Sequence, residues 1–260
     1  MEQISLTGIE LDFDKIGNGP PLLYLHSEHY FHLQASFIEG LAEDWTVYVP
    51  RHPGFDGRQP PSEFRRIEDL TYLYLDLIDH LALDEITLLG SSFGGWIALE
   101  IAVRNCSRLK GLCLLSPVGV KLSDRAERDF ADLWTYSEED SAEALFAQKA
   151  PNFEDFTADE MTATARDRQF VAYYGWKPYL HSLSLARWLH RISVSTHLIL
   201  GAKDGFTSPN YGKRLSALIP DAKLDILPNA GHYPQLEQLE KTIALISTGP
   251  CGNRQVGRVV

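Results

Sequence analysis

The sequence predicts an α/β fold, with a mostly parallel sheet of about eight strands, helices on both faces and a helical cap inserted after the sixth strand. Three observations support this prediction. Short apolar runs alternate with helical patterns, as in buried parallel strands joined by helices. The alternation stops at Pro117 and resumes near Thr196. A Gly-x-Ser-x-Gly turn, Gly90 to Gly94, connects a strand pattern directly to a helix pattern.

Residues 1–120 and 191–248 carry the pattern of the core. Residues 3–16 alternate around Gly8 and predict an antiparallel pair of strands. Apolar runs predict further strands at 22–25, 46–50, 86–89, 109–115, 196–200 and 222–227. Amphipathic spacing predicts helices at 33–43, 67–83, 96–103, 210–219 and about 233–247. The order of these elements predicts a sheet covered on both faces.

Residues 121–190 form the predicted cap, with helices at about 124–136, 138–149 and 158–172. This segment holds 12 of the 28 aromatic residues of the chain. The aromatics suit a lid above the turn at Ser92, or a helical subdomain that packs its own small core, and both can hold together. Glycine and proline break the chain from Gly249 onward, which predicts a disordered tail over 249–260.

The composition limits the class of partner. The net charge of −11 argues against a nucleic acid or an anionic membrane. Three cysteines at irregular spacing form neither a disulfide framework nor a zinc site, so no metal is expected. The N-terminus lacks the pattern of a signal peptide, and no apolar run approaches the ~20 residues that span a bilayer. We therefore expect a cytoplasmic protein.

The turn around Ser92 is the strongest functional signal. A sharp change from strand to helix strains the central residue, and glycines two positions to either side let the chain pass. The Ser92 hydroxyl would then project above the sheet, where the N–H groups of the following helix point. The alternative interpretation is a glycine- and serine-rich turn that only joins two elements, but the flanking strand and helix are the context that the nucleophile requires.

A serine nucleophile needs a base, and the base needs an acid to hold its tautomer. His232 follows the last predicted strand, and Asp204 follows the strand at 196–200, so both leave carboxyl ends of parallel strands. Asp221 follows a helix and Asp225 lies within a strand, so both fit less well. The predicted triad is therefore Ser92, Asp204 and His232.

These residues, in the order Ser, Asp, His, resemble the α/β-hydrolase family, and within it the cap-bearing esterases and meta-cleavage-product hydrolases. The segment His26-Ser27-Glu28 resembles the family's oxyanion loop, although Ser27 replaces a glycine. The resemblance implies that the backbone N–H groups of Glu28 and Phe93 form the oxyanion hole. The alternative is that the Ser27 hydroxyl is itself a donor. Serine at the elbow departs from the haloalkane dehalogenases and epoxide hydrolases.

The resemblance implies a substrate pocket under the cap. The residues predicted to line it are His26, Ser27, Trp134, Tyr173, Trp176 and Tyr233. Tyr233 stands where the hydrolases of ring-fission products usually carry tryptophan. Arg166 or Arg168 could correspond to the cap arginine of that branch.

The resulting hypothesis is a serine hydrolase that acts on a small ester or ketone through an acyl-enzyme, without metal or organic cofactor. A carboxylic ester is the first candidate for the substrate. A carbon–carbon bond of a dienone acid is the alternative, and a ligand receptor that keeps the fold without turnover is a third possibility. The oligomeric state does not follow from the sequence.

Overall fold

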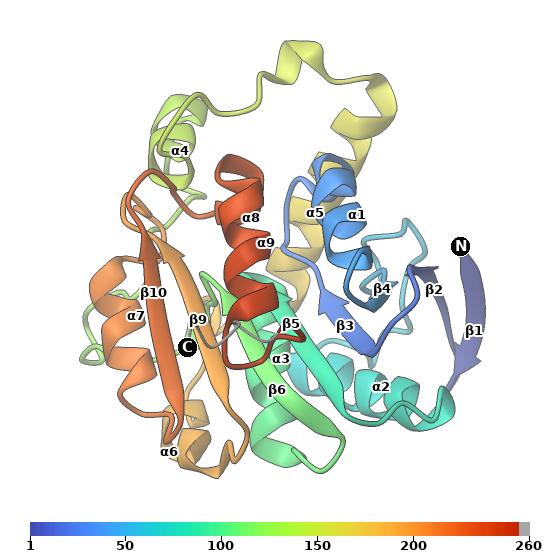
Figure 1. The fold of residues 1–260 in the computed structure, drawn as a ribbon. Helices are drawn as coiled ribbons and strands as arrows, with labels where there is room; N and C mark the ends of the chain where they lie inside the picture. Colours follow the sequence, from blue (N-terminus) through green and yellow to red (C-terminus); the bar gives the residue numbers. More distant parts are fainter. Residues whose placement is uncertain (255–260) are drawn as a thin grey trace.

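One eight-stranded sheet organises the computed structural model, which describes residues 1–254 (Figure 1). The strands follow the order β1-β2-β4-β3-β5-β6-β9-β10. Their bounds are Glu2–Leu6 (β1), Ile9–Ile16 (β2), Pro21–Leu25 (β3), Thr46–Pro50 (β4), Ile86–Ser91 (β5), Leu109–Leu115 (β6), Thr196–Gly201 (β9) and Ala222–Leu227 (β10). The pairs β1/β2 and β2/β4 are antiparallel and the others are parallel. The predicted α/β fold with a mostly parallel sheet is therefore confirmed.

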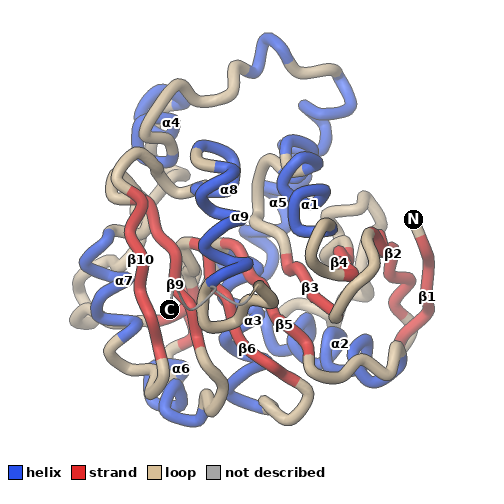
Figure 2. The backbone as a smooth tube through the Cα atoms, viewed as in Figure 1, coloured by secondary structure: helices blue, strands red, loops and turns tan. Residues whose placement is uncertain are grey.

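Helices cover both faces of the sheet, as Figure 2 shows. They are α1 (Ala35–Ala42), α2 (Ile67–His80), α3 (Phe93–Arg104), α4 (Glu138–Leu145), α5 (Ala158–Gly175), α6 (Leu185–Trp188), α7 (Pro209–Ser216), α8 (Pro234–Glu237) and α9 (Leu239–Thr248). The three short 3-10 helices are η1 (Phe31–Leu33), η2 (Phe153–Asp155) and η3 (Leu189–Arg191).

The central strands are buried on both faces because successive side chains point to opposite sides. Leu88 of β5 and Leu114 of β6 pack with α2 and α3, whereas Leu89 and Leu115 pack with α1 and α9. This arrangement explains why the strands read as continuous apolar runs. No helix within residues 1–254 combines the length and apolarity that a membrane crossing requires.

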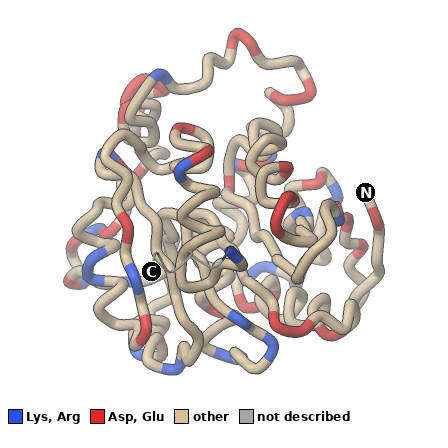
Figure 3. Tube along the Cα trace, viewed as in Figure 1, with Lys and Arg blue, Asp and Glu red and all other residues tan. Residues whose placement is uncertain are grey.

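Residues 121–190, all described, contribute no strand to the eight-stranded sheet. Figure 1 shows α4, η2 and the start of α5 as an arch at one side of the sheet. A separate two-stranded pair joins β7 (Gly119–Val120) to β8 (His181–Ser182), which the sequence did not indicate. Figure 3 shows acidic residues gathered along α4 and along the approach to α5.

The helix predicted at 124–136 is wrong, since this stretch forms turns and bends. The Asp129 carboxylate accepts hydrogen bonds from the backbone N–H groups of Leu122 and Ser123, at 3.0 and 2.9 Å. Lys121 lies 3.2 Å from the same carboxylate. Short polar side chains that satisfy the backbone in this way compete with helix formation, so the segment closes into a loop.

The predicted disordered tail is wrong for residues 249–254, and residues 255–260 lie outside the described residues. Cys251 is 1% exposed, and its backbone carbonyl accepts a hydrogen bond from Thr87 at 3.1 Å. Its side chain packs over Gly111, where an added Cβ would meet the Cys251 sulfur at 2.9 Å. Arg254 pairs with Asp44 at 2.9 Å, so this stretch continues the packing of α9 against the core.

Candidate active site

The turn between β5 and α3 holds Ser92 in a strained backbone conformation. Its φ is 48° and its ψ is −108°, in a region that non-glycine residues seldom occupy. The flanking glycines are required by close packing. A Cβ at Gly90 would lie 2.5 Å from the carbonyl oxygen of Gly94, and a Cβ at Gly94 would lie 2.0 Å from that of Leu25. The local sequence thus folds as its pattern predicts.

Ser92, His232 and Asp204 form one hydrogen-bonded chain. His232 Nε2 lies 2.7 Å from Ser92 Oγ, and His232 Nδ1 lies 2.9 Å from Asp204 Oδ2. Ser92 and His232 are completely buried, and Asp204 is 4% exposed. Burial alone would lower the pKa of His232, but the adjacent Asp204 carboxylate and, to a smaller extent, Glu28 raise it above its ordinary value. The arrangement can move a proton between a hydroxyl and an imidazole.

The loop after β9 fixes the Asp204 carboxylate. Its Oδ1 accepts hydrogen bonds from the backbone N–H groups of Phe206 and Thr207, at 2.9 and 2.7 Å. Its Oδ2 accepts one from the Thr207 hydroxyl at 2.6 Å. An acid held by three donors keeps a fixed orientation toward His232.

Helix α4 holds the loops that carry the acid and the base. The last carbonyl groups of a helix lack partners within it. In α4, the carbonyl of Ala144 accepts from Gly205 N–H at 2.9 Å, and that of Leu145 accepts from His232 N–H at 2.7 Å. The end of α4 is therefore part of the framework around His232 and Asp204, a role that no local pattern in the sequence signals.

The Glu28 side chain occupies an unexpected position. Its Oε2 accepts a hydrogen bond from Phe93 N–H at 3.1 Å, and its Oε1 accepts one from the Tyr233 hydroxyl at 2.9 Å. Oε1 also lies 3.8 Å from His232 Nε2. The prediction assigned only the backbone N–H of Glu28 to this site. The structure adds its carboxylate, which takes the N–H group predicted to bind an oxyanion.

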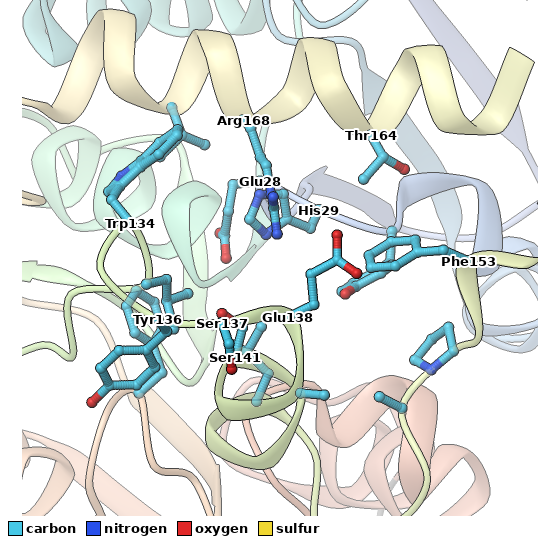
Figure 4. Close-up of a pocket in the computed structure, with 18 of the residues that line it drawn as sticks. Glu28, His29, Trp134, Tyr136, Ser137, Glu138, Ser141, Phe153, Thr164 and Arg168 are labelled. Atoms are coloured by element: carbon cyan, nitrogen blue, oxygen red, sulfur yellow. The ribbon is translucent and has the colours of Figure 1, made fainter.

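A cavity of about 150 Å³ lies beside these residues. Figure 4 shows it between α5, α4 and the loop of Glu28 and His29, with Arg168 pointing toward Glu28. Its lining includes Glu28, His29, Tyr30, Trp134, Glu138, Arg168 and Phe206. Within the described chain, neither Ser92 nor His232 lines this cavity. Access from this cavity to Ser92 is therefore closed in this structure.

Only part of the predicted pocket lining is found in this cavity. Trp134 lines the cavity. Tyr233 does not line it, but its hydroxyl donates a hydrogen bond to Glu28, which does. Tyr173 and Trp176 do not line it; Trp176 is 56% exposed and packs against Trp134.

The α5 residues that line the cavity are Thr164, Arg168 and Val171, whose spacing of four and three puts them on one face of the helix. Tyr173 lies on another face, and Trp176 follows the helix as its C-cap.

His26 and Ser27 also lie away from the cavity. The His26 ring packs against His52, with ring centroids 3.9 Å apart, and faces a separate cleft beside Arg51. The Ser27 hydroxyl donates to the His29 carbonyl at 2.9 Å and accepts from the Gln34 amide at 2.8 Å. Both side chains therefore stabilise the loop and do not face the cavity.

We expect Ser27→Ala to affect stability more than catalysis. The variant loses two buried hydrogen bonds and leaves the Gln34 amide without its partner, which costs about 1–3 kcal/mol. Thermal unfolding should then shift down by several degrees, while kcat on a good ester changes less than tenfold. A hundred-fold fall in kcat with unchanged thermal stability would instead make the hydroxyl an oxyanion donor.

His29 and Arg168 line the cavity, and of the two only Arg168 is singled out by the sequence. His29 lies in the oxyanion loop, and its Nε2 has no hydrogen-bond partner among residues 1–254. Burial lowers the pKa of His29 to about 4, so the ring is neutral near pH 7. The direction of each side chain depends on the loop and on α5, which the spacing of residue types does not reveal. Within the described residues, no cluster of His, Cys, Asp and Glu could hold a metal ion.

Comparisons with known proteins show which sequences and structures this chain is similar to. The sequence model described as the alpha/beta hydrolase family matches residues 17–245. A 2-hydroxy-6-oxo-2,4-heptadienoate hydrolase of Pseudomonas putida F1 is 25% identical, with 92% of each chain covered. Haloalkane dehalogenase 2 of Mycobacterium bovis is 26% identical, with 88% of this chain and 87% of the relative covered.

The solved structure of naproxen esterase from Bacillus subtilis has the same fold. It superposes with a TM-score of 0.74 at 20% identity, covering 94% of this chain and 88% of that chain. The fold, the strand-to-helix turn at Ser92 and the match over residues 17–245 lead to one conclusion. This chain belongs to the alpha/beta hydrolase family.

Proposed function

We propose that this hydrolase cleaves carboxylic esters through Ser92, His232 and Asp204. The observation that carries the proposal is the hydrogen-bonded chain from Ser92 through His232 to Asp204, with distances of 2.7 and 2.9 Å. A serine hydroxyl within reach of an imidazole that an acid orients is the arrangement of nucleophilic acyl transfer. The substrate is a small molecule, since the cavity beside the site measures about 150 Å³.

Acyl transfer begins as Ser92 Oγ gives its proton to His232 Nε2 and bonds to the carbonyl carbon. The carbonyl electron pair moves onto oxygen, where the N–H of Phe93 and the backbone N–H of Glu28 hold the charge. The bond to the alcohol oxygen then breaks, and that oxygen takes the proton from Nε2. Water repeats the sequence: it gives a proton to Nε2 and attacks the acyl carbon, and Ser92 recovers its proton as the acid leaves.

The segment 121–190 is the proposed lid, and we assign to it the selection of the acyl group. It contributes Trp134, Tyr179 and Phe153 among the apolar residues around the cavity. A cavity of about 150 Å³ suits one benzene-sized group. Binding energy from such a remote apolar group can be used at the reacting carbon and thus raise the rate.

A carbon–carbon bond hydrolase is the second candidate, and Arg168 favours it. Its guanidinium lines the cavity and forms no ion pair with another residue of the described chain. A guanidinium binds carboxylates in a planar, two-bonded geometry. One relative is named for a dienoate, a substrate class that carries a carboxylate. The same Ser92 and His232 would serve that reaction.

All three cysteines are free thiols, and Cys113 and Cys251 are buried. Free thiols are the usual state in a reducing compartment, where disulfides seldom persist. We therefore propose a cytoplasmic location.

We expect acyl esters with one aromatic ring or a medium chain to outpace acetate esters by about tenfold or more in kcat/KM. The reason is the apolar wall of the cavity, which a methyl group leaves unfilled. The measurement is kcat/KM for a graded series of acyl esters, with one dienoate ring-fission product included. Faster turnover of the dienoate would favour the second candidate, and binding without any turnover would indicate a receptor.

Trp134→Ala should weaken the preference for the larger acyl groups. Trp188→Ala is the matched control, because Trp188 is 44% exposed and does not line the cavity. A profile that stays flat across acyl sizes, or the same loss in both variants, would contradict the assignment of acyl selection to this segment.

A further inference from the structure

The Glu28 carboxylate lies in the place that a substrate oxygen needs. Phe93 N–H belongs to the residue after Ser92 and stands at the first position of α3, where helix N–H groups favour negative charge. That N–H group donates to Glu28 Oε2 at 3.1 Å. The predicted donor of the oxyanion hole is therefore already bound to an anionic group of the chain itself.

Tyr233 holds the carboxylate in that place. Its hydroxyl donates to Glu28 Oε1 at 2.9 Å, and its ring is completely buried beside His232. Glu28 is 4% exposed, so both of its oxygens are directed by partners that cannot move freely. The contact joins two loops on opposite sides of Ser92.

Glu28 both lines the cavity and occupies the Phe93 N–H. It lines the cavity, whereas Ser92 and His232 are 0% exposed and do not line it in the described chain. A ligand oxygen that binds Phe93 N–H from the cavity must therefore displace the carboxylate. The positive charge of Arg168 faces the same cavity and attracts the displaced carboxylate.

The carboxylate is ionised in this position. Burial opposes its charge, but the adjacent His232 favours it, and the pKa of Glu28 lies below its ordinary value. A charged acceptor holds an N–H donor more strongly than a neutral carbonyl does. The resting site therefore prefers Glu28 to a neutral ester oxygen.

We propose that Glu28 is a specificity-determining residue that competes for the Phe93 N–H with carboxylate ligands, and in particular with the acid that ester hydrolysis produces. The inference rests on the proposed function for its role in turnover. A substrate oxygen displaces Glu28 as the ester binds. When the product acid forms and ionises beside Ser92, Glu28 returns to the N–H and expels it by like-charge repulsion.

The test is binding of sodium acetate, measured by isothermal titration calorimetry on the full chain. Wild type should bind acetate weakly. Glu28→Ala should bind it at least tenfold more tightly, because the vacated N–H accepts a carboxylate. Tyr233→Phe should give a smaller gain, since it only loosens Glu28. Glu139→Gln is the control: it removes an equal charge from α4, outside the cavity lining, and should bind acetate as weakly as wild type.

Ester kinetics supply the second arm. Acetate should inhibit Glu28→Ala competitively, with a constant at least tenfold below that of wild type. The near-isosteric Glu28→Gln, checked for folding by circular dichroism, should gain a smaller part of the acetate sensitivity. Equal acetate binding in wild type and Glu28→Ala would overturn the proposal. A hundred-fold loss of kcat in Glu28→Gln without a gain in acetate binding would overturn it too, and would make Glu28 a catalytic group.

The calorimetric arm requires no turnover, so the two proposals can fail separately. Tight acetate binding by Glu28→Ala in a chain that hydrolyses no ester would retain the carboxylate competition and reject the proposed function. Full ester turnover, with equal acetate binding by wild type and Glu28→Ala, would retain the proposed function and reject the carboxylate competition.

Discussion

Ser92→Ala is expected to lower kcat on the best ester by roughly 10⁶-fold, the loss typical of a removed serine nucleophile. Without Oγ no acyl-enzyme forms, and the remaining rate comes from the oxyanion hole and binding, about 10³-fold over water. The fold should survive, because alanine keeps the Cβ that already tolerates a φ of 48° at this position. Circular dichroism and thermal unfolding check this point.

Ser91→Ala is the matched control for Ser92→Ala. Ser91 is also buried, but its hydroxyl accepts a hydrogen bond from the Gln235 amide at 3.0 Å and does not contact His232. Its removal should leave kcat within about tenfold of wild type. Turnover near the wild-type rate in Ser92→Ala, with contaminating esterase excluded, would reject the mechanism.

Asp204→Asn is expected to lower kcat by roughly 10⁴-fold. The asparagine NH₂ would face His232 Nδ1 and favour the tautomer with its proton on Nε2, which cannot accept the Ser92 proton. An amide also fails to stabilise the imidazolium that forms during the reaction. The measurement is kcat on one ester for purified variants whose folding has been checked, since Asp204 also accepts from Phe206 and Thr207.

Asp221→Asn provides the comparison. Asp221 lies after α7 and accepts a hydrogen bond from the Ser195 hydroxyl at 2.5 Å, away from His232. This variant should keep its activity. If Asp221→Asn were the inactive variant and Asp204→Asn the active one, the acid would be wrongly assigned and the geometry around His232 would need another explanation.

Much of the fold follows from patterns of local sequence. The strands at 46–50 and 109–115 have the predicted bounds, because apolar runs between turns specify buried strands. The edge strand at 222–227 also has them, with Leu224 and Ile226 alternating with charged residues. The turn at Ser92 is also local, since the strand, both glycines and the helix are contiguous in the chain. The stretch at 124–136 was mispredicted because Asp129 bonds the backbone of Leu122 and Ser123, a local alternative to the helix.

The positions of His232 and Asp204 follow from one further rule. Carboxyl ends of parallel strands meet at one edge of the sheet, so strand direction alone places the residues after β9 and β10 near Ser92. Strand direction does not set their hydrogen-bonding distances, because these depend on the α4 carbonyls that hold both loops.

By itself, the sequence determined the α/β fold, the strained turn at Ser92 and the candidates for acid and base, because each rests on neighbours in the chain or on strand direction. Only the tertiary structure decided what fills the space between them. The Tyr233 hydroxyl and the Glu28 carboxylate, 205 positions apart in the chain, meet at 2.9 Å and place a charge on Phe93 N–H. No local pattern encodes that contact, since it depends on how two distant loops pack, and their packing determines what can reach Ser92.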